Sequence, residues 1–324
     1  MALVTRGDII TLLLRSLEKK GGTSLFQRVL SPGKARVKMT WRQERDSIRN
    51  WYEIPLVEMR QNELITGNPH TSPSAYAAEK FLAGSRLTAL SLGSGSGSRE
   101  ISWAETGKFE RITGIDLSEE RVKNARSKLA GTPFAGVVEF VTGDVMQHRF
   151  EDESLDVVIA EGILHHLSPV EKALENIHRS LKPGGILMVN EYVGPDRFQW
   201  TNEQLRYCDA LLAILPADLR TYRGTSRIKS RVYKPGTLSM LVYDPSEAIE
   251  SSRIIGALQH RFKLLERRDY GGTILQPLLK DISHHFIEMT PEKEGSLRFL
   301  FTAEDFLMSA HLIASDFTFV VAQK

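Results

Sequence analysis

The sequence has few of the features that identify secreted, membrane-spanning or strongly charged proteins. A single cysteine, Cys208, among 324 residues excludes an internal disulfide and a cysteine-based structural zinc site. The 42 basic and 40 acidic residues leave a formal net charge of +2, so charge gives no reason to expect a nucleic acid or a membrane surface as the main partner. We therefore expect a soluble protein with neither kind of partner, in a reducing, cytoplasmic compartment.

Long apolar runs are missing as well. The stretch Ile9–Leu14 is interrupted by Arg15, is too short to cross a membrane and is not followed by a small-residue cleavage site. We expect residues 1–20 to form an amphipathic packing helix.

Alternating strand and helix patterns begin near Leu87. Buried strands are predicted at 87–92, 109–115, 137–142, 155–160 and 186–190, and helices at 98–106, 118–129 and 168–181. Strands that alternate with helices of this length predict an α/β fold with a doubly wound, mostly parallel sheet. The strand at 155–160 is a continuous apolar run, as expected when helices cover both faces.

A glycine-rich turn follows the first strand and opens the first helix. Gly93, Gly95 and Gly97 allow the backbone to turn tightly and to approach a ligand closely. Their spacing differs from the usual dinucleotide and ATP patterns. Asp116 and Asp144 follow the next two strands, where one carboxylate can accept hydrogen bonds from ribose hydroxyls and the other from an adenine amino group. Leu117 and Val145 are placed to sandwich the adenine ring.

These motifs resemble those of class I S-adenosylmethionine-dependent methyltransferases. Residues 89–97 resemble the first motif, Asp116 and Asp144 the second and third, 155–167 the fourth and 181–187 the fifth. Ser94 stands where many members carry Cys or Ala. The resemblance implies a Rossmann-like, seven-stranded sheet with a reversed last strand, S-adenosylmethionine as cofactor and S-adenosylhomocysteine as product. The residues that it assigns to the cofactor are Leu92, Gly93, Ser94, Gly95, Gly97, Asp116, Leu117, Asp144, Val145 and Glu161.

The rest of the chain is expected to surround this core. We divide the sequence into an N-terminal helical extension or lid (1–84), the cofactor-binding core (85–192), a helix with a basic lid insertion (193–260), and strands and helices that complete the sheet (261–324). Within these parts we expect a loose connector at 21–39, a helix at 41–63 that Pro55 ends or bends, and further helices at 201–215, 275–289 and 302–314. Strands at 261–270 and 317–322 are expected to close the sheet as an antiparallel edge.

The candidate catalytic residues follow strand ends on the side where such sheets bind ligands. Methyl transfer from a sulfonium is an in-line displacement, and a hydroxyl acceptor also needs a base. His165 or His166 is the leading candidate, because imidazole titrates near neutral pH; the alternative is that one of them only packs or caps a helix. Glu191 is a further candidate. Glu161 with Asn190 or Glu191 matches a metal site poorly, so we expect no metal.

Candidate substrate-binding residues lie in the added parts. Tyr52, Tyr192, Trp200 and Arg223 are expected to line the acceptor pocket, with Trp51 and Phe198 nearby; ordinary core packing is the alternative for the aromatic residues. The basic stretch 220–234 is interpreted either as a lid over an acidic substrate or as a solvated loop.

The sequence thus predicts a methyltransferase of small-molecule biosynthesis that acts on oxygen. The alternatives are a protein or RNA methyltransferase, if the basic stretch forms an open groove with exposed aromatic residues, and a non-catalytic cofactor-binding partner protein. The acceptor and the oligomeric state stay open.

Overall fold

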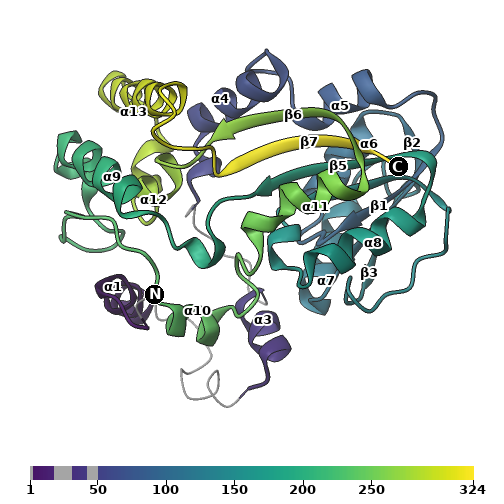
Figure 1. The fold of residues 1–324 in the computed structure, drawn as a ribbon, viewed down its shortest axis with the longest axis horizontal. Helices are drawn as coiled ribbons and strands as arrows, with labels where there is room; N and C mark the ends of the chain where they lie inside the picture. The colour runs from purple at the N-terminus through teal and green to yellow at the C-terminus, as the bar shows by residue number, and fades with distance from the viewer. Residues whose placement is uncertain (1–2, 18–30, 42–49) are drawn as a thin grey trace.

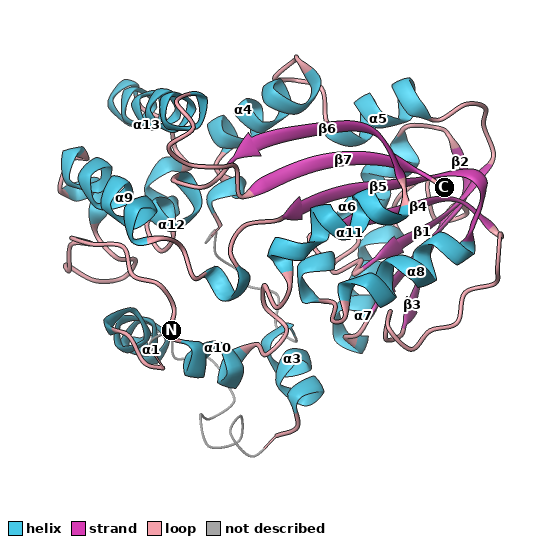
Figure 2. Ribbon diagram, in the orientation of Figure 1, coloured by secondary structure: helices cyan, strands magenta, loops and turns pink. Residues whose placement is uncertain are grey.

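A seven-stranded sheet with helices on both faces forms the centre of the protein. The computed structural model describes residues 3–17, 31–41 and 50–324 (Figures 1 and 2). The strand order is β3-β2-β1-β4-β5-β7-β6. The strands are β1 (Leu87–Leu92), β2 (Phe109–Asp116), β3 (Val138–Thr142), β4 (Leu155–Glu161), β5 (Leu181–Tyr192), β6 (Lys263–Gly271) and β7 (Phe317–Gln323).

One strand runs against the others. β1 to β5 pair in parallel, whereas β7 is antiparallel to both β5 and β6. The expected reversed last strand is confirmed, and the two late strands close the sheet as an antiparallel pair. β6 is the edge strand and runs with the parallel set. After β6 the chain passes through α13 (Pro291–Ser309), which lies beyond the carboxyl ends of the sheet, so β7 enters from that end (Figure 1).

Two helical layers bury the sheet. α4 (Pro55–Thr66), α5 (Pro73–Phe81), α6 (Ser98–Glu105) and α7 (Glu119–Leu129) pack on one face, and α8 (Val170–Ser180) and α11 (Ile254–Arg261) on the other. In β4, Val157 and Ile159 point into the first layer and Val158 and Ala160 into the second, each at most 1% exposed. The predicted apolar run is therefore buried on both faces.

Local chemistry fixes several helix starts as predicted. Ser118 caps α7, since its hydroxyl accepts a hydrogen bond from the Arg121 amide, and Thr201 caps α9 (Asn202–Ile214) in the same way. The helix expected at 41–63, which Pro55 was expected to end or bend, differs from the structure. Pro55 is the first residue of α4 rather than a break, because the first turn of a helix needs no amide proton from that position. Residues 42–49 of that prediction lie outside the described residues.

Other predicted boundaries are wrong where tertiary contacts decide them. Residues 33–39 of the expected connector belong to α3 (Gly33–Trp41), and residues 21–30 lie outside the description. The insertion at 193–260 also contains α10 (Thr237–Tyr243), a helix that the sequence analysis does not predict. The helix expected at 275–289 is only α12 (Leu275–Leu279) followed by a 3-10 turn at Ser283–Phe286, and the one expected at 302–314 begins earlier, as α13. β5 already starts at Leu181, so its first residues include the Pro-Gly-Gly turn.

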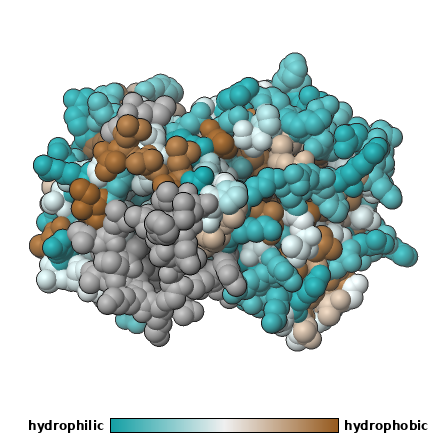
Figure 3. Space-filling model, turned by 90° about the horizontal axis from the view of Figure 1, so that it is seen from below, coloured by the Kyte–Doolittle hydropathy of each residue, from teal (hydrophilic) through white to brown (hydrophobic). Residues whose placement is uncertain are grey.

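The N-terminal extension and the insertion pack on each other. Asp8 of α1 (Arg6–Leu17) accepts hydrogen bonds from the Gly236 amide and the Ser239 hydroxyl at the start of α10. Arg36 of α3 donates to the Leu241 carbonyl of α10. Together α1, α3 and α10 form a unit below the carboxyl ends of the strands (Figure 1). Brown apolar atoms gather on the left half of that face (Figure 3), and Ile9, Leu238 and Leu241 are among the exposed apolar residues.

A buried carboxylate sits under the glycine-rich turn. Glu100 in the first turn of α6 is 0% exposed, and the Ser91 hydroxyl donates to its Oε1 at 2.5 Å. Burial raises the pKa of Glu100 from 4.5 to about 7, although the Ser91 hydrogen bond opposes the shift. Because the folded pKa is above the unfolded one, the residue contributes most below pH 4.5 and this contribution is lost as the pH rises through about 7.

We predict that Glu100→Gln stabilises the fold at pH 8 but not at pH 4.5. The expected gain in unfolding free energy at pH 8 is about 2–3 kcal/mol, since the neutral amide removes the cost of a buried charge. Urea unfolding at the two pH values checks it, with the exposed Glu105→Gln of the same helix as control. An equal effect of Glu100→Gln at both pH values contradicts the prediction.

Candidate functional site

A large cavity opens at the carboxyl ends of β1, β2, β4 and β5. Its volume is about 1300 Å³, more than the roughly 300–1,000 Å³ of a usual small-molecule pocket. It therefore has room for a cofactor and a second ligand. The glycine-rich turn and Asp116 line one side, and His165, Tyr192 and Glu247 line another.

The glycine-rich turn forms the wall nearest to β1. Gly93 and Gly97 have φ angles of +66° and +84°, which L-residues with a side chain rarely adopt. A Cβ on Gly97 would lie 2.7 Å from Phe140 Cζ, and one on Gly93 would lie 2.8 Å from Ile163 Cδ1. Gly97 is thus required for packing α6 against β3, while Gly93 and Gly95 line the cavity. The absence of side chains creates a cradle that suits S-adenosylmethionine.

The two predicted carboxylates lie at the adjoining strand ends. Asp116 accepts hydrogen bonds from the Gly95 amide at 2.9 Å and the Ser118 amide at 2.8 Å, which fixes the carboxylate at the cavity wall. Asp144 accepts from the Met146 amide and pairs with Lys34 of α3 at 2.6 Å. The N-terminal extension therefore reaches the position that the sequence assigns to the adenine amino group.

Glu161 closes the cavity at the end of β4. Its Oε1 accepts a hydrogen bond from Trp103 Nε1 at 2.9 Å, and its Oε2 lies 3.6 Å from Arg99 Nε. Arg99 also donates to the Glu161 carbonyl. Sequence reasoning missed Arg99. Its position could have indicated a role, because Arg99 lies in the first turn of the helix that follows the glycines, close to where the glycine-rich turn would bind its ligand.

Eight of the ten predicted cofactor residues line the cavity: Gly93, Ser94, Gly95, Asp116, Leu117, Asp144, Val145 and Glu161. The other two, Leu92 and Gly97, lie behind this wall in the packing of β1 and α6. Leu117 and Val145 directly follow the two carboxylates in the chain and line the cavity; their contact with an adenine ring stays a prediction.

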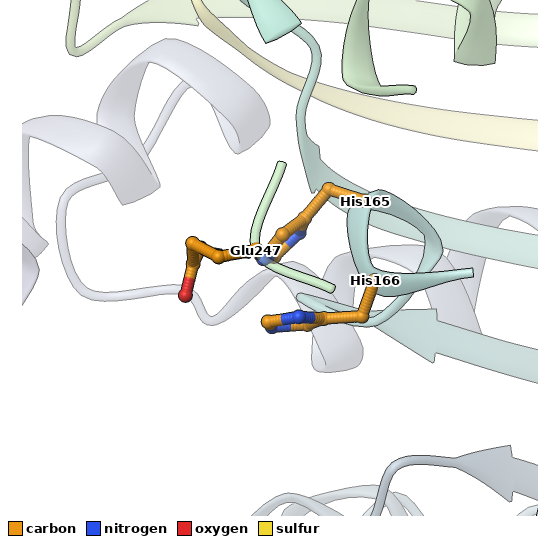
Figure 4. A group of neighbouring side chains, drawn as sticks. All are labelled: His165, His166 and Glu247. Carbon is orange, nitrogen blue, oxygen red and sulfur yellow. Dashed lines mark ion pairs between the residues drawn. The ribbon is translucent and has the colours of Figure 1, made fainter. Parts of the chain in front are cut away.

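A second group of side chains forms another part of the cavity wall. His165 lies between two carboxylates. Its Nδ1 is hydrogen-bonded to Glu191. Its Nε2 is 3.4 Å from Oε1 of Glu247, which lies beside both histidines (Figure 4). Burial lowers the pKa of His165, but Glu191 and Glu247 outweigh that effect and raise it to about 10. Burial also opposes the ionisation of Glu247, yet the neighbouring imidazoles lower its pKa to about 2. Glu247 comes from the insertion, and sequence reasoning missed it.

Glu191 holds this wall in place. It is 2% exposed. Its Oε2 accepts hydrogen bonds from the amides of Ile163 and Leu164 at 2.9 and 2.6 Å, and its Oε1 accepts from the Tyr192 amide at 2.8 Å. Burial opposes ionisation, but the charge of His165 keeps the pKa of Glu191 below its usual value. The geometry therefore gives Glu191 a positioning role.

His166 stacks on His165 with ring centroids 4.1 Å apart. Its Nδ1 is 3.1 Å from Ser246 Oγ, and that hydroxyl donates to Asp244 Oδ1 at 2.6 Å. Since the hydroxyl has only one proton, it must accept from His166, so His166 carries its proton on Nδ1. Burial, together with the charge of His165, lowers the pKa of His166 and favours the neutral imidazole.

The predicted substrate-binding residues all line the cavity, in different environments. Tyr52 is 45% exposed, whereas Tyr192 and Trp200 are 3% and 2% exposed. Phe198 links the last two, with ring centroids 4.8 Å from Tyr192 and 5.6 Å from Trp200. Tyr192 and Trp200 thus belong to the core as much as to the wall.

The basic stretch is not one solvated loop. Arg223 is exposed at the cavity, but Lys229 is 4% exposed and its Nζ donates to the carbonyls of Pro277, Leu278 and Lys280. These bonds tie the insertion to the end of α12, because an ammonium satisfies carbonyls that the short helix leaves unpaired. His284 lines the cavity, and its partner His285 bonds to Thr221.

Comparison with known proteins identifies the domain that contains this part of the chain. Residues 90–189 match the family model described as a methyltransferase domain. Residues 90–189 therefore form an S-adenosylmethionine-dependent methyltransferase domain, and this part of the chain contains the glycine cradle and both histidines.

Similar proteins include enzymes of quinone biosynthesis. A demethylmenaquinone methyltransferase of Desulfitobacterium hafniense is 35% identical over 89 residues, which cover 28% of this chain and 35% of that protein. A ubiquinone/menaquinone biosynthesis C-methyltransferase of Pseudomonas fluorescens is 31% identical over 136 residues, 41% of this chain and 53% of that protein. The chain thus spans about half the length, or less, of these relatives. An S-adenosylmethionine-dependent methyltransferase structure from Mesorhizobium loti has 17% identity and a TM-score of 0.43, covering 78% of this chain and 98% of that one.

None of the described helices is long and apolar enough to cross a membrane.

We predict that Asp116→Ala weakens S-adenosylmethionine binding by about 1–3 kcal/mol, because ribose hydroxyls lose a buried acceptor. Isothermal titration calorimetry measures the change. Asp116→Asn, which keeps one acceptor oxygen, should lose less, and the exposed Asp152→Ala should lose nothing. An unchanged affinity in Asp116→Ala would refute the assignment of the ribose site.

Proposed function

We propose that the protein transfers the methyl group of S-adenosylmethionine to a hydroxyl oxygen of a small molecule. The proposal is carried by one observation: the glycine cradle and the His165–His166–Glu247 wall line the same 1300 Å³ cavity. The cofactor fits the cradle, and the acceptor then lies between its methyl group and the histidine wall.

The proposed reaction needs little covalent help from the protein. The acceptor hydroxyl loses its proton, its oxygen forms a bond to the methyl carbon, and the carbon–sulfur bond breaks with its electron pair staying on sulfur. The positive sulfur makes the methyl electrophilic, so the protein has to align the reactants and exclude water. A hydroxyl is a weak nucleophile at neutral pH, and the neutral imidazole of His166, whose proton lies on Nδ1, is the group of this wall that can take its proton on Nε2.

A small acceptor is supported by the way in which the insertion closes the cavity. Lys229 anchors the basic stretch to buried carbonyls, and Glu247 of the insertion reaches His165. A protein or RNA methyltransferase would need an open basic groove. Such a groove is disfavoured because Lys229, one of the basic residues of this stretch, is buried.

Carbon methylation is the second candidate. It is favoured by the relative whose name specifies a C-methyltransferase. Carbon and oxygen acceptors give products that differ in the chemical shift of the new methyl group, so identification of one labelled product decides between them.

The test is transfer of ¹³C-methyl from labelled S-adenosylmethionine into fractionated cell extract. We expect the label in a small metabolite as a methoxy signal. A methyl on carbon would favour the second candidate, and label in protein or RNA would overturn the proposal. Cofactor binding without transfer to any fraction would favour a non-catalytic partner protein.

We predict that His166→Ala lowers kcat at least tenfold and leaves the Kd for S-adenosylmethionine unchanged, because the imidazole faces the acceptor and not the cofactor cradle. Steady-state kinetics on the identified acceptor and calorimetry measure the two quantities. The exposed His260→Ala on α11 is the control. Full activity of His166→Ala would remove His166 from the proposed catalytic wall.

A further inference from the structure

The geometry points to a site for a divalent transition-metal ion held by His165, His166 and Glu247, open to the acceptor side of the cavity. The inference rests on the proposed function for its role, but not for its existence. This set of ligands differs from the combination of Glu161 with Asn190 or Glu191 that the sequence analysis considered. Glu247 comes from the insertion, and only the fold brings it to the two histidines (Figure 4).

The spacing of the three side chains suits one small cation. One ligand atom from each residue lies within 4.8 Å of the other two, and His165 Nε2 is 3.4 Å from Glu247 Oε1. Metal–ligand bonds of about 2.1 Å in a tetrahedral site place neighbouring ligand atoms roughly 3.4 Å apart. His165 Nε2 and Glu247 Oε1 already have this separation. The Glu247 side chain is 23% exposed, so it has space to adjust to the third ligand.

Both imidazoles are held from behind by a hydrogen bond to Nδ1. His165 Nδ1 is hydrogen-bonded to the buried carboxylate of Glu191. His166 donates its Nδ1 proton to Ser246, whose own proton goes to Asp244. In each ring Nε2 is therefore the nitrogen that is left to bind an ion. Ligating histidines in metal sites usually have this arrangement, with the other ring nitrogen donating to a carboxylate or polar group.

The charges and the ligand count also fit. Glu247 and Glu191 supply two negative charges beside two imidazoles, which balances a divalent ion. Two nitrogens and one carboxylate oxygen suit zinc, iron or manganese better than calcium or magnesium. Three protein ligands leave a position open toward the acceptor.

The ion would act on the acceptor hydroxyl. As a Lewis acid beside the oxygen it would lower the pKa of the hydroxyl. The hydroxyl proton would then pass to solvent, the oxygen would bond to the methyl carbon, and the carbon–sulfur bond would break with its electron pair on sulfur. The surrounding residues keep the ligands in place and exclude water.

Cobalt(II) binding to the full chain tests the site, because its visible spectrum and stoichiometry do not depend on turnover. We expect one ion per chain after chelation and dialysis, with absorption typical of a nitrogen- and oxygen-bound four- or five-coordinate ion. Glu247→Gln, which keeps the shape of the side chain, and His166→Gln should each weaken binding at least tenfold. His284→Gln, from the second histidine pair at the same cavity, is the matched control and should bind normally. Circular dichroism and S-adenosylmethionine affinity confirm that each variant is folded.

The existence of the metal site and the role of the ion in methyl transfer are tested separately. Absence of stoichiometric cobalt binding, or unchanged binding by both Glu247→Gln and His166→Gln, overturns the metal site. Methyl transfer by the chelated, metal-free protein at an unchanged rate overturns the role of the ion and leaves the proposed function intact. Stoichiometric binding that these variants lose supports the site even if the proposed acceptor class is wrong.

Discussion

The site depends on the buried carboxylate of Glu191 at the end of β5. It accepts hydrogen bonds from the amides of Ile163 and Leu164 and is hydrogen-bonded to the His165 ring. One side chain therefore joins the end of β5 to the turn after β4. A charge that is 2% exposed is tolerated only when it is well paired. Glu191 is paired with three amides and an imidazole. The histidines are consequently fixed relative to the sheet, and the sheet in turn fixes the glycine cradle.

The cavity is built by parts of the chain that are distant in sequence. The core supplies the cradle and the two histidines, the insertion supplies Glu247, and α3 of the N-terminal extension brings Lys34 to Asp144. Because α1 and α3 both bond to α10, the extension and the insertion cover the cavity as one unit. The division of the sequence into separate lid segments remains an interpretation, and these contacts favour treating both lids together.

The two walls of the cavity use different means to position groups. The cradle relies on glycines whose missing side chains let a ligand approach the backbone. The histidine wall relies on hydrogen bonds behind each ring, which set where its protons lie. The first arrangement binds a large part of a ligand by shape, whereas the second prepares two nitrogen atoms for chemistry at one point. Their presence in one enclosed space links the methyltransferase domain to the proposed transfer to oxygen.

The sequence by itself determined the core. Continuous apolar strands, capped helices and glycines at fixed spacing are local patterns, and they predicted β1 to β4 within about one residue, together with the cradle and both carboxylates. Tertiary structure decided the rest. The place of β7 between β5 and β6 depends on where α13 returns the chain. Pro55 and Lys229 obtained their roles from neighbours that spacing does not reveal. Glu247 meets His165 across 82 residues of chain, and no local pattern records such a contact, because it arises only when the insertion folds back over the sheet.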